Sequence, residues 1–201
     1  KMGIENMSSF LANFNLGKKT LIDISSEKKG IVPNKNWKKN NFKSRQNQSW
    51  FKGETVIAGI GQGYMLATPL QLAMATVMIA NKGKAFRPHL VRAIEDAETG
   101  ELNYIPKEKI NNLESIKKRN WDIVHQGMIA VVNERRGTAY GIFKSNVPVA
   151  GKTGSSQVYT IDKSSTKDIP DELQDHGLFI GFAPLEKPII ALAVIVENGG
   201  G

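Results

Sequence analysis

The sequence contains no cysteine, which excludes disulfide bonds and metal sites built from thiolates. Histidine is scarce, and His89, His125 and His176 show none of the short spacings typical of metal ligands. No run of apolar residues reaches the roughly 20 that a membrane-spanning helix needs, and the longest apolar block, near 70–80, has the length of a buried helix. The composition therefore predicts a globular domain without a metal site.

Acidic residues are almost missing from one segment. Residues 18–52 contain ten Lys and Arg residues against only Asp23 and Glu27, an excess of eight that equals the net charge of the whole 201-residue chain. The positive charge therefore belongs to an arm, which suits a solvated face or anionic membrane lipid. A nucleic-acid-binding module is a further hypothesis, because four aromatic residues that could stack on bases lie in this arm: Trp37, Phe42, Trp50 and Phe51.

The clearest helix is predicted over 69–80. Thr68 is a good N-cap, Pro69 suits the first helical position, and Gln71 completes a capping box. The segment is apolar on nearly every side, so we expect this helix to be buried.

Two further helices are predicted, over 3–15 and over 115–132. The buried face of the second should contain Trp121, Val124, Met128, Val131 and Val132. Residues 18–58 have no sustained period and indicate a long surface excursion with a short strand over 20–24.

The C-terminal third is rich in β-forming residues. Strands are predicted over 147–149, 155–161, 177–184 and 188–199, and the short 183–188 link suits antiparallel neighbours. Residues 86–96 should be extended and 98–102 should form a turn. Neither a repeat nor an internal boundary is visible, so we expect one α+β domain with an antiparallel sheet flanked by helices.

The stretch VPVAGKTGSSQV (147–158) contains Gly-Lys-Thr, which is also part of the phosphate-binding loop. That loop needs a glycine where this chain has Asn146, and a helix after the motif, whereas a strand is predicted here. On a strand, Lys152 and Gly154 share one face and Thr153 lies on the other. A ligand that binds both the Lys152 ammonium and the Thr153 hydroxyl therefore needs a local twist of the strand. An ammonium and a hydroxyl suit a carboxylate, and a peptide can lie along such a strand. The alternative is a solvated Lys152 and a bulge at Gly154.

Lys152-Thr153-Gly154 on a strand resembles the third signature motif of penicillin-binding proteins and β-lactamases. The segment GIGQGYMLATPLQLAMATVMIANKGKAFRPHLV (59–91) resembles the one that precedes this motif in class B penicillin-binding proteins. Similar likenesses are Gly-Thr-Ala at 137–139, His176 followed by GLFIGFAP, and the final VIVENGGG. GIGQGY with TPLQLA is most like the elongation type, penicillin-binding protein 2.

This resemblance implies a β-lactamase/transpeptidase-like fold and a serine D,D-transpeptidase of cell-wall synthesis. In that family a serine attacks a D-alanyl-D-alanine stem peptide, the last D-alanine leaves, and an amine of a neighbouring strand resolves the acyl-enzyme. β-Lactam antibiotics acylate the same serine. The resemblance also implies no cofactor, a membrane glycosyltransferase as partner, and a place at the periplasmic face of the bacterial inner membrane.

Residue roles follow from the same resemblance. Lys152 and Thr153 are expected to hold the substrate carboxylate, and Gly154 to let the peptide lie against the strand. The backbone N–H of Ser155 is expected to form half of the oxyanion hole.

The family's nucleophile lies in Ser-x-x-Lys, followed by Ser-x-Asn, and this chain has no Ser-x-Asn. We interpret as chance matches the four Ser-x-x-Lys patterns, which are Ser25–Lys28, Ser26–Lys29, Ser115–Lys118 and Ser164–Lys167. Residues 1–201 are thus expected to be the C-terminal portion of a single transpeptidase domain, inactive by itself. A non-catalytic peptide-binding module is the remaining alternative.

Overall fold

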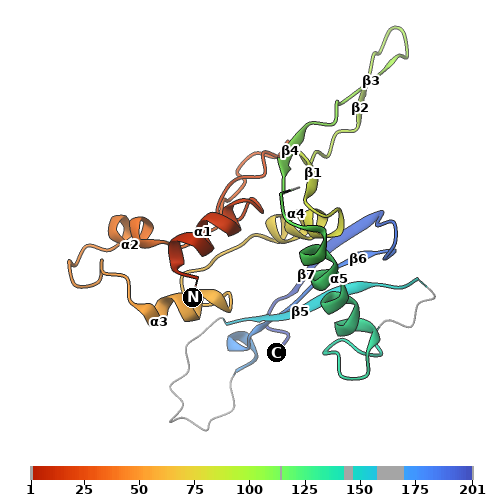
Figure 1. Cartoon of the computed structure of the whole chain (residues 1–201). Coiled ribbons are helices and arrows are strands. Elements are labelled where there is room, and N and C mark those ends of the chain that lie inside the picture. The colour runs from red at the N-terminus through yellow and green to blue at the C-terminus, as the bar shows by residue number, and fades with distance from the viewer. Residues whose placement is uncertain (1, 114, 143–146, 158–169, 201) are drawn as a thin grey trace.

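The computed structural model describes residues 2–113, 115–142, 147–157 and 170–200 (Figure 1). Its elements, in chain order, are α1 (Ile4–Ala12), α2 (Lys35–Asn41), α3 (Lys52–Gly59), α4 (Pro69–Ala80), β1 (Lys84–Phe86), β2 (Ala93–Glu95), β3 (Leu102–Tyr104), β4 (Lys109–Asn112), α5 (Lys118–Asn133), β5 (Ala150–Ser156), the short 3₁₀ helix η1 (Asp171–Leu173), β6 (His176–Ala183) and β7 (Ile190–Val196).

The centre of the fold is a three-stranded antiparallel sheet in the order β5–β6–β7. β5 pairs with β6 from Ala150 opposite Phe182 to Ser156 opposite His176. Helix α5 packs on β5, helix α4 packs on β7 and β6, and the two helices also contact each other, so they lie together on the sheet (Figure 1). An antiparallel sheet flanked by helices confirms the predicted fold class.

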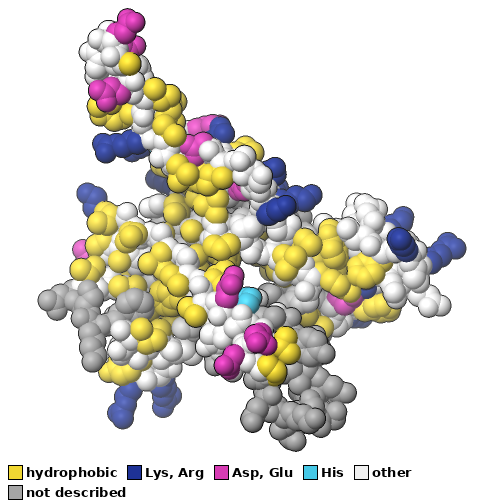
Figure 2. All heavy atoms as spheres, turned by 180° about the vertical axis from the view of Figure 1, so that it is seen from behind, with side chains coloured by type: hydrophobic (Ala, Val, Ile, Leu, Met, Phe, Trp, Pro, Cys, Tyr) yellow, Lys and Arg dark blue, Asp and Glu magenta, His cyan; other side chains and the backbone are white. Residues whose placement is uncertain are grey.

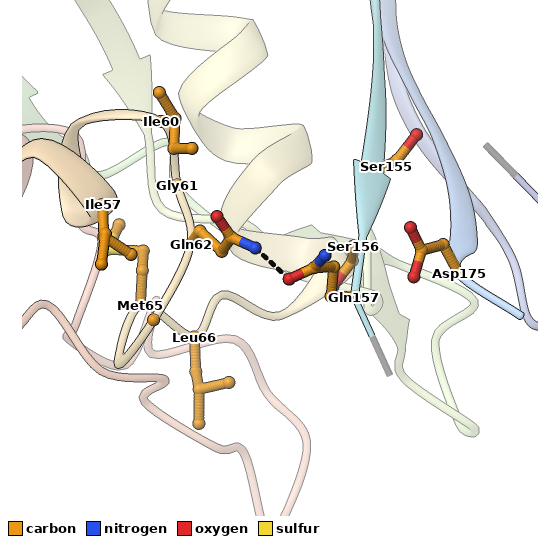
Figure 3. Close-up of a pocket in the computed structure, with 11 residues that line it drawn as sticks. Ile57, Ile60, Gly61, Gln62, Met65, Leu66, Ser155, Ser156, Gln157 and Asp175 are labelled. Atoms are coloured by element: carbon orange, nitrogen blue, oxygen red, sulfur yellow. Dashed lines mark hydrogen bonds between the residues drawn. The ribbon is translucent and has the colours of Figure 1, made fainter. Parts of the chain in front are cut away.

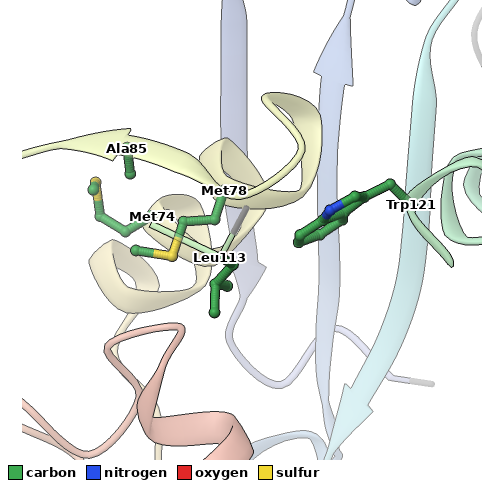
Figure 4. Packing of buried hydrophobic residues seen from close by; sticks show 5 residues of the cluster. All are labelled: Met74, Met78, Ala85, Leu113 and Trp121. Carbon is green, nitrogen blue, oxygen red and sulfur yellow. The ribbon is translucent and has the colours of Figure 1, made fainter. Parts of the chain in front are cut away.

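Helix α4 begins at the predicted capping box. The Thr68 hydroxyl accepts the N–H of Gln71 at 3.2 Å, and the Gln71 side chain accepts the N–H of Thr68 at 2.9 Å. The helix then supplies Met74 and Met78 to a core cluster that also contains Ala85, Leu113 and Trp121 (Figure 4). A second cluster joins this helix and α5 to the sheet through Ala80, Met128, Ala150 and Phe182.

Gln71 has a second role that its place in the capping box does not reveal. Its side chain is fully buried, and its amide nitrogen lies 2.6 Å from the carbonyl oxygen of Lys18, 2.8 Å from that of Lys29 and 3.3 Å from that of Asn15. One amide therefore joins the start of α4 to two loop segments more than 40 positions earlier. These carbonyls belong to loop residues outside the helices and strands, so the amide supplies hydrogen bonds that no regular ladder provides there.

The basic arm is folded, and the prediction for residues 18–58 is wrong in two respects. The expected strand over 20–24 is absent, because the N–H groups of Thr20 and Leu21 donate to the Glu27 carboxylate and Leu21 has a positive φ of 63°. Helices α2 and α3 were not predicted. They have seven and eight residues, too few for an apolar period to stand out, although Asn34 is a regular N-cap that accepts the N–H of Trp37 at 2.7 Å.

Lys38 is the buried centre of this arm and only 3% exposed. Its ammonium forms an ion pair with Glu54 and donates to the carbonyl of Ser49 at 2.8 Å. Four aromatic rings surround the ammonium at centroid distances of 5.1 to 5.9 Å, from Phe42, Trp50, Phe51 and Tyr64. Trp37 packs on two of these rings, so the aromatics considered for base stacking take part in an intramolecular cluster, although Phe51 stays 59% exposed. The other Lys and Arg residues of the arm are exposed, and Figure 2 shows dark blue side chains on the surface of the molecule.

Strands β2 and β3 form a hairpin that projects from the body of the molecule (Figure 1). The turn predicted over 98–102 is confirmed except at its end: Asp96 accepts the N–H groups of Glu98 and Thr99, but Leu102 is already the first residue of β3. At the base of the hairpin, hydrogen bonds from the N–H groups of Val91 and Leu90 lower the pKa of Asp23 below its ordinary value. Of the predicted extended segment 86–96, only β1 at its start and β2 at its end form strands.

The remaining predictions need smaller corrections. Helix α5 starts at Lys118, three positions after the predicted start, and Val124 is 43% exposed, so the buried face is formed by Trp121, Met128 and Val132. Residues 147–149 precede β5 and are not a strand, and residues 158–161 lie outside the described part of the chain. No helix in the described part is both long enough and apolar enough to cross a membrane.

Candidate functional site

Lys152, Thr153 and Gly154 lie in the middle of β5 (Figure 1). Among the described strands, β5 pairs only with β6, so it is an edge strand. Lys152 and Gly154 are exposed and Thr153 is half-buried, as expected for alternating faces of a strand. The predicted strand is confirmed, and the tripeptide does not open a helix as a phosphate-binding loop would.

Two polar contacts converge on Thr153. The hydroxyl oxygens of Thr153 and Thr138 are 2.6 Å apart, which is hydrogen-bond distance. The ammonium of Lys152 folds back along the strand and donates to the carbonyl oxygen of Thr153 at 2.6 Å. An ammonium and a hydroxyl therefore meet around one residue, although their side chains leave the strand on opposite faces. A carboxylate placed here would find both groups.

The Gly137-Thr138-Ala139 turn positions the Thr138 hydroxyl. The N–H of Ala139 donates to the carbonyl of Val131 at 3.0 Å, the N–H of Gly137 donates to Glu134 at 2.8 Å, and Ala139 is fully buried. A Cβ atom added to Gly137 would lie 2.1 Å from the backbone oxygen of Val131. The turn therefore packs closely against the end of α5, and this packing holds Thr138 in a defined position.

We expect Gly137→Ala to lower the free energy of unfolding by about 2 kcal/mol, because helix α5 or the turn must move to admit the methyl group. Gly127→Ala is the matched control: it lies inside α5 with no atom within 4 Å of an added Cβ. That change should stabilise the helix by about 0.5–1 kcal/mol. Urea denaturation of both variants checks this, and equal effects would show that the turn tolerates a side chain.

A pocket of about 600 Å³ adjoins the far end of β5. One wall comes from α3 and the loop after it, and the other from the end of β5 and the residue before β6 (Figure 3). The Gln62 side chain donates to that of Gln157 and joins the two walls. The lining residues are Ile57, Ile60, Gly61, Gln62, Gly63, Met65, Leu66, Ser155, Ser156, Gln157 and Asp175.

The sequence predicted part of this site. Ser155 lies on β5 and lines the pocket, and its expected backbone role in an oxyanion hole stays a prediction. Thr138, Gln62 and Asp175 were not singled out as site residues. A local signal existed only for Gln62, which lies between two glycines with positive φ, at 79° and 74°, in a loop that presents its side chain.

The Ser-x-x-Lys serines do not lie at the pocket. Ser25 and Ser26 form a turn, Ser115 lies before the start of α5, and none of the three lines the pocket. The fourth pattern, 164–167, lies outside the described residues. That all four are chance matches stays a prediction.

The family model of the penicillin-binding protein transpeptidase domain matches residues 1–201. The chain is 42% identical over 202 residues to the peptidoglycan D,D-transpeptidase MrdA of Acinetobacter baumannii. This match covers 99% of this chain and 29% of that protein. It is 37% identical over 204 residues to MrdA of Haemophilus influenzae, covering 100% of this chain and 30% of that protein. The chain thus spans less than a third of the length of these relatives.

Solved structures agree with this result. The complex of penicillin-binding protein 2 with MreC from Helicobacter pylori has a TM-score of 0.80 at 35% identity, covering all of this chain and 33% of that one. Pseudomonas aeruginosa penicillin-binding protein 2 in complex with WCK 5153 has a TM-score of 0.75 at 40% identity, covering 98% and 38%. The chain therefore belongs to the penicillin-binding protein transpeptidase-domain family, among relatives that are peptidoglycan D,D-transpeptidases of the penicillin-binding protein 2 type.

Proposed function

We propose that this chain supplies the substrate-carboxylate strand of a peptidoglycan D,D-transpeptidase that cross-links stem peptides. The observation that carries the proposal is the exposed edge strand on which Lys152 and Thr153 bring an ammonium and a hydroxyl together. The stem peptide ends in a carboxylate on D-alanyl-D-alanine, and β-lactams carry a carboxylate in a comparable place. Charge-assisted hydrogen bonds to such a group are about twice as strong as neutral ones.

The remaining parts of the proposal concern the whole protein. The serine nucleophile is not among the serines of residues 1–201, and the backbone N–H of Ser155 serves as an oxyanion donor for it. The protein acts at the periplasmic face of the inner membrane beside a membrane glycosyltransferase. By itself the chain binds the peptide terminus without acyl transfer.

Peptide binding tests the carboxylate role. We expect a peptide ending in D-alanyl-D-alanine to bind weakly, with a Kd of about 1 mM, and to shift the backbone amide signals of 152–156 in nuclear magnetic resonance spectra. The same peptide with a C-terminal amide should bind at least about fivefold more weakly, because it lacks the charge. Lys152→Met should remove this difference, whereas Lys187→Met, outside the site, should keep it. Equal binding of acid and amide by the unmodified chain would refute the proposal.

A labelled penicillin tests the missing nucleophile. We expect no covalent adduct after the chain is incubated with a fluorescent penicillin and analysed by denaturing electrophoresis and mass spectrometry. The control is a heat-denatured sample, which reveals non-specific acylation of lysine side chains. A stable adduct on any serine of the folded chain would contradict the prediction and identify that serine as the nucleophile.

A further inference from the structure

The β2–β3 hairpin is a two-stranded ribbon without a packed face. Directly opposite residues of an antiparallel pair share a face, so Ile94 lies on one face, with Asn103, and Leu102 and Tyr104 lie on the other. Ile94 is 60% exposed, Leu102 50% and Tyr104 60%, so apolar side chains on both faces are open to solvent. Figure 2 shows such side chains on the projection, in yellow. A lone two-stranded hairpin is marginally stable in water, so a third strand would stabilise it.

The free edge of β3 offers the backbone groups that a third strand needs. At the base of the ladder, the N–H of Ile105 donates to the carbonyl of Arg92 at 3.0 Å. Hydrogen-bonded and non-hydrogen-bonded pairs alternate along an antiparallel ladder, so the N–H and C=O groups of Leu102 and Tyr104 point away from β2. Among the described strands, β3 pairs only with β2. The outward groups are therefore available for strand addition.

A pocket of about 570 Å³ lies at the base of the hairpin. Its apolar lining consists of Pro88, Ile105 and Pro106. The polar groups of the lining are already engaged within the protein. Arg87 pairs with Glu108 at 3.3 Å, and the Asp23 carboxylate accepts two backbone N–H groups. The Nδ1 atom of His89 lies 2.6 Å from the carbonyl oxygen of Val91. What remains for a ligand is the apolar lining, which suits an aliphatic side chain.

The other end of the same edge is acidic. The chain has a net charge of +8, but residues 93–106 contain no Lys or Arg and carry the carboxylates of Glu95, Asp96, Glu98 and Glu101. Within the described part of the chain, the carboxylates of Glu98 and Glu101 have neither a hydrogen bond nor an ion pair. Glu101 precedes Ile105 by four positions, about 13 Å along an extended strand, so a segment of five or six residues reaches from the tip to the pocket.

We propose that the β2–β3 hairpin docks an extended segment of a partner protein, which pairs with the free edge of β3 as a third strand. An aliphatic side chain at one end of this segment enters the pocket against Ile105 and Pro106. Lys or Arg side chains at its other end pair with Glu98 and Glu101. The same carboxylates repel an anionic membrane surface, which excludes lipid as the occupant. The inference is independent of the carboxylate site at Lys152.

Synthetic peptides test the chemistry of this surface. The probe is acetyl-Leu-Val-Thr-Val-Thr-Lys-Lys-amide, and its binding is followed by backbone amide shifts of the 201-residue chain. We expect saturable shifts at 101–106 with a Kd of about 1 mM. Glutamine in place of both lysines should weaken binding about fivefold at low salt and less at high salt. Serine in place of the leucine should weaken it by about fivefold at any salt concentration, because the pocket then stays unfilled.

Backbone methylation distinguishes strand addition from attraction between charges alone. Every second N–H of an added strand faces β3, and the others face solvent. Two versions of the probe carry N-methyl groups on either the even or the odd residues. We expect one version to lose binding and the other to keep it. Equal affinities of the two versions would overturn strand addition.

Two double variants identify the responsible carboxylates. Glu98→Gln with Glu101→Gln should remove the preference for the lysine probe over its glutamine version. Glu186→Gln with Glu197→Gln removes two exposed carboxylates elsewhere and should keep the preference. Dispersed amide spectra establish that both proteins fold.

Three results would overturn the proposal. The first is a lysine preference that survives the loss of Glu98 and Glu101, and the second is a set of shifts centred on 152–156. The third is self-association of the chain through 101–106 in sedimentation experiments, because the edge would then belong to a second copy.

Discussion

Replacing Lys38 with methionine is expected to destabilise the arm by about 3 kcal/mol. The substitution keeps most of the side-chain volume but leaves the Glu54 carboxylate, only 19% exposed, without its cation. It also removes the donor to the Ser49 carbonyl and the cation from the centre of four aromatic rings. Urea denaturation followed by tryptophan fluorescence measures the loss directly, because Trp37 and Trp50 belong to the cluster.

Lys39 offers a control of the same type on the same helix. Its side chain is exposed, so Lys39→Met changes the net charge equally and should alter stability by less than about 0.5 kcal/mol. Adding Glu54→Gln to Lys38→Met should recover part of the loss, because the uncompensated charge is then gone. The interpretation of Lys38 as the centre of the arm fails if both lysine variants lose the same stability.

The pH dependence of the Lys38 effect has a defined sign. Burial by itself raises the pKa of Glu54, but hydrogen bonds from Lys38 and the N–H of Phe51, with the charge of Lys38, lower it overall. A carboxyl whose pKa is lowered in the folded state contributes stability above its unfolded pKa of about 4.3, and this contribution is lost as pH falls through the folded pKa. The stability difference between the unmodified chain and Lys38→Met should therefore narrow below about pH 4.

Gln71→Leu is expected to cost about 3–5 kcal/mol, the largest effect among these variants. Leucine has a similar size but removes the buried amide that donates to three loop carbonyls and the acceptor for the N–H of Thr68. Thr68→Ala is the matched comparison, because it removes the other half of the capping box and should cost only about 1 kcal/mol. Faster hydrogen exchange near 15–18 and 29–31 should accompany the leucine variant alone.

Gln71→Glu separates hydrogen bonding from packing. A carboxylate keeps the shape but repels the same three carbonyls, and burial raises its pKa, so the penalty should grow as pH rises above about 4.3. At low pH the protonated acid regains one donor, and part of the stability should return. A pH-independent loss equal to that of Gln71→Leu would show that the amide acts through packing alone.

The contrast between Gln71 and Lys38 shows which contacts could be predicted from the sequence and which could not. The capping box of Thr68 and Gln71 was predicted because both partners lie within one helical turn, where spacing alone determines the contact. Lys38 could not be distinguished from Lys39 in the sequence, because the two lysines are adjacent in a polar run. Only Lys38 contacts Glu54, which lies 16 positions later in the chain. The arm was consequently predicted to be an open basic surface, although its aromatic residues and one of its lysines are packed together.

Strand β5, which contains the site, shows the same difference between features that the sequence predicts and contacts that only the folded structure reveals. β-Forming residues after Val149 and the absence of a helix start after Thr153 placed Lys152-Thr153-Gly154 on a strand, and these are local properties of the backbone. The partner of the Thr153 hydroxyl and the charge beside Ser156 were not predictable in this way. They come from a turn after α5 and from the residue before β6, which approach only once the sheet has formed.

The sequence by itself thus determined the fold class, the capped helix α4, strands β6 and β7, and the strand position of the Lys-Thr-Gly motif. Tertiary structure alone decided which lysine is buried, which amide joins distant loops, and which carboxylate enters the pocket. The physical reason is range: capping and strand alternation act between residues a few positions apart, whereas ion pairs and pocket walls depend on chain segments brought together by packing.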